Sequence, residues 1–439
     1  MGPCRGKRCL PRAKSALKAY GIEVTGDFTP RAPMAAQVGL GEVAGRKEGR
    51  SLVLHPSASI LNGGKCGALI AGGGMAGSSL FRYMAEAGFS PVLVNRDRGS
   101  SWRNIAGGRP AFSLPAIADI ADHNLDIFKE LDKKADIGFR LTRYVNFAHD
   151  SQTFRALEES MKWSKAYMVE SKDFRKEISE YMNPGLSLYT HALITENCWQ
   201  ANPGRTIELI RAIGTEKGGR VMEDTELIEV CRKGKGYEVT LRDISGRYIK
   251  METEIFVNAL GASAPVFAEM LGYHTGLFPV RHQAFITKRL PLLGKGGGPL
   301  DMLIDRRKYK GFSAVYGQQL AHTGQIIGCA SPASDPSEAG RNLKVNTEDF
   351  IEIAAEVFTE WLPCIGNAGI QATWSGYYTE PRYIVDPEAG LFIGMRGHGF
   401  MLSQYIGKLF VDSLTGKHVP EYFKELKLGG NGLSENAFK

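Results

Sequence analysis

Six consecutive residues, Gly72 to Gly77, have the types and spacing that bind the phosphates of a nucleotide. They read Gly72, Gly73, Gly74, Met75, Ala76 and Gly77 and form a complete G-x-G-x-x-G motif. Gly72 would permit a tight turn, Gly74 would let the backbone approach a pyrophosphate, and Gly77 would allow close packing of helix on strand. A helix that starts here directs unpaired N–H groups and its positive dipole end at the phosphates. The motif therefore predicts a dinucleotide site.

The residues around this motif predict the elements that must position it. Residues 68–71 form a short apolar run, which is typical of a strand buried on both faces. Apolar residues then recur at helical spacing from Met75 onward, and Gly88 is placed to end the helix. Residues 91–94 predict a second buried strand. Strand, glycines, helix and strand in this order are the context that a dinucleotide motif requires.

One residue of the motif departs from the usual pattern. The second strand should end in Asp or Glu, which accepts hydrogen bonds from a ribose hydroxyl. Here it ends in Asn95, followed by Arg96 and Asp97. Asn can bind the hydroxyl without charge assistance, and Arg96 could face the 2′-phosphate of NADP. An NADP-linked Rossmann reductase is therefore one alternative.

Composition and charge exclude several classes of protein. The chain has 439 residues and a net charge of +7, and ten Lys/Arg against four Asp/Glu in residues 1–50 account for +6 of it. A nearly neutral remainder argues against nucleic-acid binding. No apolar run is long enough to predict a membrane span or a signal peptide. The seven cysteines are scattered and odd in number, which favours reduced thiols and a cytoplasmic location.

Further segments resemble the D-amino-acid oxidase-like (DAO) flavoprotein superfamily. Residues 99–108 (GSSWRNIAGG) look like its Ser-x-Arg-Asn-x-Gly-Gly segment, and residues 252–265 (ETEIFVNALGASAP) resemble its strand and Asn-Ala-x-Gly turn. Residues 279–283 (PVRHQ) are similar to its Pro-Val-Arg-x-Gln strand, and residues 390–416 to its final strand, Gly-His-Gly loop and closing helix. The superfamily includes glycine oxidase, sarcosine oxidase, D-amino-acid dehydrogenases and the FAD subunits of proline and opine dehydrogenases.

The resemblance spans about residues 66–424 and implies an α/β fold with bound FAD. It implies a Rossmann-like FAD-binding domain, a parallel sheet with flanking helices, built from residues 65–130, 195–270 and 385–424. An α+β substrate domain with an antiparallel sheet would comprise residues 131–194 and 271–384. A basic N-terminal segment (1–64) and a polar tail (425–439) flank these. Beyond the glycine motif, the residues expected to bind the cofactor are Asn95, Arg96, Arg103, Asn104, Gly107, Leu227, Ala259, Gly261, Gly397, His398, Gly399, Phe400 and Met401.

The C-terminal segment supports this interpretation from its residues alone. Residues 391–393 predict a strand, and the glycines that follow would let the backbone pass close to a flat ligand. A helix over residues 400–414 would point its N-terminus at the flavin N1–C2=O edge and stabilise negative charge there. A glycine-rich turn between a core strand and a core helix is the structural alternative.

Amine oxidation also needs a group that holds the substrate carboxylate, usually an arginine. The candidates are Arg281, Arg306, Arg382 and Arg396. Where the family has Trp-x-Gly-x-Arg-Pro, residues 374–382 place Tyr378 at the Arg position and Arg382 four residues later. The anchor has moved, or the substrate lacks a simple α-carboxylate.

Three other side chains are open to two interpretations. Tyr316 and Tyr378 could hold a carboxylate or close a lid, or could be core residues. His398 could manage protons near the flavin or be a structural loop residue. His282 is expected to pack. The catalytic candidates are Arg281, Tyr316, Tyr378, Arg382 and His398.

The first nine residues, MGPCRGKRC, resemble the second half of a bacterioferritin-associated-ferredoxin-like [2Fe–2S] module. A helix over residues 10–22 and an Arg-Ala-Pro arm would follow. A cluster needs four thiolates, so Cys4 and Cys9 would be metal ligands only if other segments completed the set. Either a longer native chain carries the remaining ligands, or this is a remnant that binds no cluster or shares one with a partner chain.

Together these features predict an FAD-dependent dehydrogenase or oxidase. It would oxidise the C–N bond of a small amino or imino acid, or of an opine-like secondary amine, by hydride transfer to flavin N5. Electrons would pass to an iron–sulfur or other carrier, such as an electron-transfer partner subunit. A catalytically silent flavin-fold subunit of a redox complex is the non-enzymatic alternative.

Overall fold

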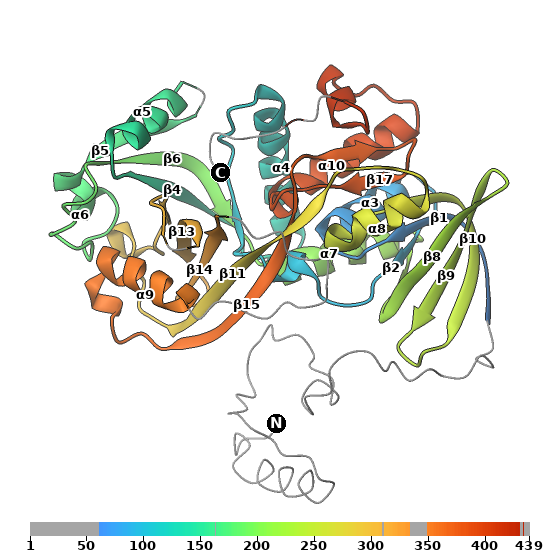
Figure 1. Cartoon of the computed structure of the whole chain (residues 1–439), viewed down its shortest axis with the longest axis horizontal. Helices are drawn as coiled ribbons and strands as arrows, with labels where there is room; N and C mark the ends of the chain where they lie inside the picture. The colour runs from blue at the N-terminus through green and yellow to red at the C-terminus, as the bar shows by residue number, and fades with distance from the viewer. Residues whose placement is uncertain (1–60, 163, 310, 334–348, 431–432, 434–439) are drawn as a thin grey trace, which may run out of the picture. The chain divides into compact units, whose positions relative to one another are not determined.

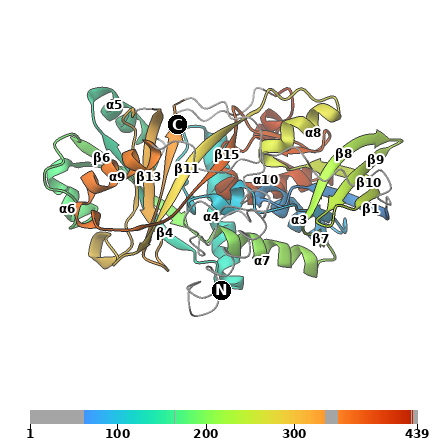
Figure 2. The ribbon, with the colours of Figure 1, turned by 60° about the horizontal axis from the view of Figure 1, so that its bottom comes forward.

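The computed structural model describes residues 61–162, 164–309, 311–333, 349–430 and 433. These residues form two β-sheets with helices packed against them, and the two sheets lie side by side (Figure 1 and Figure 2). Residues 1–60, which include Cys4, Cys9 and the expected helix over residues 10–22, lie outside the described part of the chain.

The first sheet is built around parallel strands from distant parts of the sequence. Its path runs β16-β17-β10-β1-β2-β7, with β1 paired in parallel to both β10 and β2. β16 is an antiparallel edge strand, and β8 and β9 extend β10 as an antiparallel meander. The strands are β1 (Leu61–Ala71), β2 (Val92–Val94), β7 (Arg220–Met222), β8 (Thr225–Lys233), β9 (Gly236–Asp243), β10 (Tyr248–Asn258), β16 (Ile384–Asp386) and β17 (Leu391–Ile393). This confirms the expected Rossmann-like sheet.

Helices cover this sheet as the sequence predicts. α3 begins at Met75 and ends at Glu86, and Gly88 follows with a φ of +86°, which suits glycine. Asn202 caps α7, since its side-chain oxygen accepts a hydrogen bond from the Arg205 N–H. The helices of this part are α3 (Met75–Glu86), α4 (Pro115–Lys134), α7 (Pro203–Glu216), α8 (Ala264–Met270) and α10 (Gly399–Leu414).

The second sheet is largely antiparallel. Its path is β15-β11-β14-β13-β12-β4-β6-β3, with β5 paired to β6, and the β12–β4 pair is parallel. The strands are β3 (Gly107–Gly108), β4 (Arg140–Ala148), β5 (Ala166–Glu170), β6 (His191–Gln200), β11 (Phe278–Arg289), β12 (Met302–Asp305), β13 (Phe312–Gln319), β14 (Gln325–Pro332) and β15 (Ile370–Glu380). With its helices it confirms the expected α+β architecture, and β6 crosses the expected domain boundary at residue 195.

An apolar core lies between this sheet and its helices. α9 (Asp349–Trp361) packs Phe358 and Trp361 against Phe147 and Phe285 of the strands. Two shorter helices are α5 (Ser151–Ser160) and α6 (Phe174–Glu177). The 3-10 helices are η1 (Ser100–Arg103), η2 (Ser171–Asp173), η3 (Gly261–Ser263), η4 (Lys295–Gly297), η5 (Pro363–Ile365) and η6 (Glu421–Leu426).

Candidate functional site

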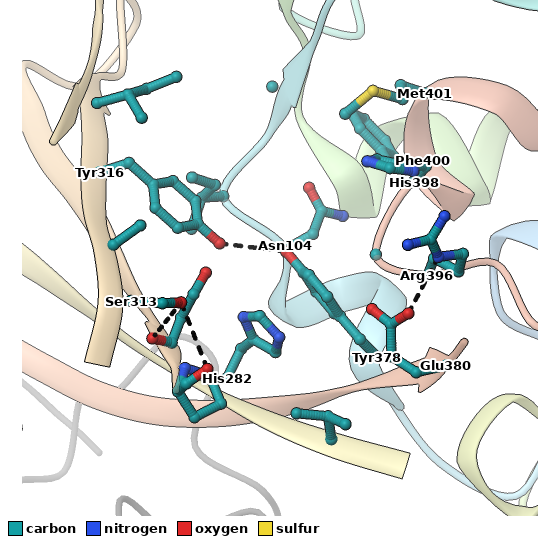
Figure 3. A pocket seen from close by; sticks show the side chains of 18 of the residues that line it. Asn104, His282, Ser313, Tyr316, Tyr378, Glu380, Arg396, His398, Phe400 and Met401 are labelled. Atoms are coloured by element: carbon teal, nitrogen blue, oxygen red, sulfur yellow. Dashed lines mark hydrogen bonds and ion pairs between the residues drawn. The ribbon is translucent and has the colours of Figure 1, made fainter. Parts of the chain in front are cut away.

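A cavity of about 590 Å³ lies between the second sheet and the loop that leads into α10 (Figure 3). Strands β11, β12, β13 and β15 supply one part of its wall, and residues 396–398, 400 and 401 supply another. The lining is mostly aromatic and aliphatic, with a few polar and charged side chains. Such a cavity suits a small organic ligand that is oriented by few polar contacts.

The loop before α10 contributes His398 and Gly397 to this wall. The Nδ1 atom of His398 lies 2.6 Å from the hydroxyl of the buried Tyr383, which holds the imidazole ring in place. Gly397 has a φ of +78°, and a Cβ atom there would lie 2.2 Å from the Tyr378 ring. Glycine is therefore required at 397 both by the backbone and by the tyrosine. Phe400 and Met401, at the start of α10, also line the cavity.

Two tyrosines and a histidine stand close together on the sheet side of the cavity. The hydroxyls of Tyr316 and Tyr378 lie 3.3 Å apart, and the Tyr378 ring stacks on His282 with 3.6 Å between ring centroids (Figure 3). Burial is the main cause that raises the pKa of both Tyr316 and Tyr378 above the ordinary value. Both hydroxyls are therefore protonated at neutral pH and able to donate. His282, expected to pack, does so and also lines the cavity.

Of the four arginines that the sequence analysis proposed as carboxylate anchors, two line the cavity and two do not. Arg306 and Arg396 line the cavity, and the Nε atom of Arg396 donates a 3.0 Å hydrogen bond to Glu380. Arg281 does not line it, because its neighbours in β11 do, and successive side chains of a strand point to opposite faces. Arg382 instead directs its Nη2 atom at the Thr275 carbonyl oxygen, 3.4 Å away.

Arg109 lines the cavity as well, and the sequence analysis missed it. It directly follows β3, at the end of the Ser-x-Arg-Asn-x-Gly-Gly segment, and its guanidinium lies 4.0 Å from the centre of the Phe112 ring. Its position next to that segment is the signal that could have indicated it.

The glycine turn lies outside the lining of this cavity and has the close contacts that were expected of it. Gly72 has a φ of +108°, and a Cβ atom there would lie 2.4 Å from the Ala259 carbonyl oxygen. At Gly77 a Cβ atom would lie 1.8 Å from the Gly72 carbonyl oxygen, so only glycine lets α3 approach β1 this closely. The Met75 N–H donates to the Ser101 hydroxyl at 2.9 Å, which fixes η1 beside the start of α3.

An acid that the sequence analysis missed stands beside Asn95. The Asn95 amide donates to the Glu223 carboxylate at 2.5 Å, and Arg211 binds the other carboxylate oxygen at 2.6 Å. Glu223 follows β7, which pairs in parallel with β2. The carboxyl ends of neighbouring parallel strands meet at the same edge of a sheet. An acid directly after the strand next to β2 was therefore the signal that could have indicated Glu223.

Arg96 is engaged by acids of the protein. Its guanidinium binds Asp97 and Glu226, each at 2.9 Å. Burial opposes its charge, but these two acids leave the pKa of Arg96 above its ordinary value. This pairing occupies the side chain that an NADP 2′-phosphate would need.

Arg103 provides a test of whether the chain fits the pyrophosphate of FAD. Its side chain is buried, and its Nη1 atom has no hydrogen-bond partner among the residues that the structure describes. Burial lowers the pKa of Arg103. A buried guanidinium N–H at the end of η1, next to the start of α3, suits an anionic phosphate, because a buried donor is costly unless it is bonded. The residues present fit the cofactor.

The other residues expected at the cofactor lie in three places. Asn104 and Gly107 line the cavity, and the Asn104 side chain accepts a 2.7 Å hydrogen bond from the Ala106 N–H. Ala259 and Gly261 follow β10, and the Ala259 N–H donates to the Ala71 carbonyl at 2.8 Å beside the glycine turn. Leu227, in β8, is buried in an apolar cluster with residues of β1, β2, β9 and β10.

No group of three or more His, Cys, Asp or Glu side chains suited to a metal ion occurs in the described part of the chain. Cys4 and Cys9 lie outside it, so a [2Fe–2S] cluster stays a prediction from the sequence. Within the same described ranges, no helix is both long and apolar enough to cross a membrane.

Comparison with known proteins agrees with the fold. The family model DAO, described as FAD dependent oxidoreductase, matches residues 68–413. The L-proline dehydrogenase of P. horikoshii is 22% identical with a TM-score of 0.70, over 84% of this chain and 97% of that one. The glycine oxidase of Geobacillus kaustophilus is 16% identical, TM-score 0.70, over 83% and 98%. An L-amino acid deaminase of Proteus vulgaris is 14% identical, TM-score 0.67, over 85% and 99%. No curated protein sequence matches significantly.

Proposed function

Because the chain belongs to the DAO family of FAD-dependent oxidoreductases, we propose that it oxidises the C–N bond of a small amino or imino acid, or of an opine-like secondary amine. The observation that carries the proposal is the cavity in which arginine and tyrosine side chains of the second sheet face the Gly397–Gly399 loop. The names of the similar structures support it, since all three proteins act on amino acids.

The chain offers a continuous set of groups for the cofactor. The glycine turn, the start of α3 and Arg103 would hold the pyrophosphate, and Asn95 with Glu223 would hold the ribose. The loop before α10 would lie along the flavin ring. When bound, FAD supplies the acceptor for the two electrons that leave the substrate.

The cavity side chains would orient the substrate. Guanidinium groups would bind the carboxylate, and whichever of the Tyr316 and Tyr378 hydroxyls does not donate to the other would donate a further hydrogen bond to it. The imidazole of His398, held at Nδ1 by Tyr383, would manage the proton of the substrate amine. The apolar lining excludes water from the C–N bond.

We also propose that the electrons pass from the cofactor to an iron–sulfur or other carrier in preference to oxygen. The support is the pair Cys4 and Cys9 in the sequence. The NADP-linked alternative was favoured by Arg96 as a partner for a 2′-phosphate. The side chain of Arg96 instead binds Asp97 and Glu226, so this support no longer holds.

Anaerobic reduction of the purified protein tests the proposal. We expect a yellow protein with an absorbance band at about 450 nm that is bleached by one class within a panel of amino acids, N-methyl amino acids, proline analogues and opines. The reduced protein should then be reoxidised faster by an artificial electron carrier than by oxygen. A colourless protein that takes up no FAD contradicts the proposal. Tight FAD binding with no reduction across the panel would indicate the catalytically silent subunit instead.

A further inference from the structure

Arg396 has a backbone conformation that is unusual for its residue type. Its φ angle is +48°, in the left-handed region that glycine adopts freely and that a residue with a long side chain rarely occupies. The Arg396 N–H donates to the Thr379 carbonyl oxygen at 3.2 Å, so the end of β15 holds the loop in this conformation. Residues held in such strained conformations cluster at ligand sites, which makes Arg396 a candidate for a functional role.

The Arg396 side chain is buried and only partly satisfied. It is 1% exposed, and its Nε atom donates to the Glu380 carboxylate at 3.0 Å (Figure 3). Its guanidinium carbon lies 5.9 Å from the centre of the Tyr383 ring. The Nη1 atom of Arg396 has no hydrogen-bond partner among the residues that the structure describes. A buried guanidinium N–H without an acceptor is unfavourable, because the group has lost its water, so Nη1 is suited to bind a ligand.

The unpartnered donor belongs to the wall of the cavity. Arg396 lines the cavity together with Glu380 and with Gly397 and His398, which follow it directly in the chain. The proposed function places this loop along the flavin ring. A molecule in the cavity, either the cofactor or the substrate, can therefore supply the acceptor for Nη1.

The charge of the Arg396–Glu380 pair distinguishes between these two sources. Within the pair, the guanidinium and the carboxylate compensate each other. A substrate carboxylate at Nη1 would place a second acid on the same guanidinium and leave the buried group with an excess negative charge. A neutral carbonyl oxygen accepts the same N–H without that excess. The flavin ring carries carbonyl oxygens of this kind, so the pair suits the cofactor.

We propose that Nη1 of Arg396 donates a hydrogen bond to a carbonyl oxygen of the flavin ring and thereby raises the reduction potential of the bound cofactor. Two added electrons make the ring oxygens more negative, so a cationic donor binds reduced FAD more strongly than oxidised FAD. Glu380 limits this effect, because its carboxylate lies against the same guanidinium. The inference rests on the proposed function and assigns Arg396 to the cofactor rather than to the substrate carboxylate.

The reduction potential of bound FAD tests the inference without any substrate. The FAD-reconstituted protein is reduced anaerobically with dithionite beside a dye of known potential, and the absorbance of both is followed. Arg396→Lys keeps a cation beside Glu380 but lacks the guanidinium fork and its Nη1 donor. We expect the equilibrium constant for reduction of FAD to fall about tenfold in this variant, which corresponds to about 30 mV for a two-electron couple.

Glu380→Gln should shift the potential in the opposite direction. This substitution removes the counter-charge and leaves Nη1 in place, so the equilibrium constant for reduction should rise about tenfold. A merely structural role of the pair would not produce shifts of opposite sign in its two members. Arg247→Lys is the matched control and should leave the potential unchanged, since the Arg247 side chain is 62% exposed and pairs with Asp243. Circular dichroism and thermal unfolding show whether each variant is folded.

Titration with butyrate, a carboxylate without an amine, separates the cofactor from the substrate as the partner of Nη1. If Nη1 bound a substrate carboxylate, Arg396→Lys would weaken butyrate binding and leave the potential of the ligand-free protein unchanged. That result would overturn the inference. Potentials that stay at the wild-type value in both Arg396→Lys and Glu380→Gln, or that shift in the same direction, would overturn it as well.

Failure of this inference differs from failure of the proposed function. Dithionite supplies the electrons, so the potentials decide the role of Arg396 even when no amine of the panel reduces the flavin. An amine that bleaches the flavin, while both variants keep the wild-type potential, leaves the proposed function intact and refutes the inference. A protein that takes up no FAD refutes both.

Discussion

The side-chain amide of Asn95 donates a 2.5 Å hydrogen bond to the carboxylate of Glu223, and so joins the ends of two neighbouring parallel strands. A dinucleotide site usually has an acid at the position of Asn95. Here that residue is an amide, and the acid, Glu223, comes from the neighbouring strand. Arg211 binds the same carboxylate and also contacts the Gly73 carbonyl and the Ser78 hydroxyl. Glu223 is therefore connected to the glycine turn through Arg211.

We expect Glu223→Gln to weaken FAD binding by about tenfold, because a charged acceptor binds a ribose hydroxyl about twice as strongly as a neutral one. The dissociation constant, measured by fluorescence quenching of FAD on titration with apoprotein, checks this without any turnover. Glu229→Gln, on the solvent-exposed part of β8, is the control and should leave FAD binding unchanged.

Exchanging the two groups tests the pairing itself. Asn95→Asp alone should also weaken FAD binding, because two carboxylates at 2.5 Å repel each other. The double variant Asn95→Asp/Glu223→Gln restores one acid and one amide, and should recover most of the affinity. Additive losses in the double variant would show that the two residues act independently.

Arg396→Met should destabilise the protein by about 3–5 kcal/mol, because it leaves the carboxylate of Glu380 buried without its cation. The free energy of unfolding from urea titration measures this. Removal of both charges in Arg396→Met/Glu380→Gln should recover part of the loss. The pair that Asp243 forms with Arg247, whose side chain is 62% exposed, is the comparison, and Arg247→Gln should cost much less than Arg396→Met. If Arg396→Met and Arg247→Gln lost similar free energies of unfolding, the result would contradict the assignment of Arg396–Glu380 as a buried pair.

Gly397→Ala should cost more stability than Gly416→Ala. Both glycines have positive φ angles, +78° and +73°, so both substitutions cost about 1–2 kcal/mol of backbone strain. Only at Gly397 does the new methyl group meet another residue, the Tyr378 ring. The excess loss of Gly397→Ala over Gly416→Ala in urea unfolding measures that clash, and equal losses would contradict it.

Glu252 should make part of the stability depend on acid pH. Hydrogen bonds from Lys233 and then Lys65, with the charges of both, lower the pKa of Glu252 from 4.5 to about 2. A carboxylate whose folded pKa is depressed stabilises the fold above its unfolded pKa, and this contribution disappears as pH falls through the folded pKa. Wild-type protein should therefore exceed Glu252→Gln in unfolding midpoint at pH 7, and the difference should vanish between about pH 4.5 and 2. A difference that stays constant over this range would refute the role of the charge.

Local patterns sufficed to predict the elements around the glycine turn. The apolar run of β1, the glycines and the helical spacing after Met75 each act over a few residues, and the structure confirms the strand, the turn and α3. The strand at residues 391–393 and the following helix were predicted within one residue for the same reason. The resemblance to the DAO family, carried by such segments, is confirmed by the family match.

The residues that line the cavity were harder to predict from the sequence, as its arginines show. Arg281 and Arg306 are equally plausible from residue type, but only Arg306 lines the cavity. In β11 the decision rests on strand register, because a shift of one residue would move Arg281 to the other face. Arg109 entered the lining because β3 pairs with β6, a pairing that two glycines give no local pattern to predict.

The sequence by itself determined the glycine turn and the type of each nearby element, because short-range sterics and hydrophobic periodicity encode them. Tertiary structure alone decided which polar groups meet. Asn95 and Glu223 are 128 residues apart, and Tyr316 and Tyr378 are 62 apart. Their contact depends on strand order and register across each sheet, which arise from the packing of the whole domain rather than from any single segment.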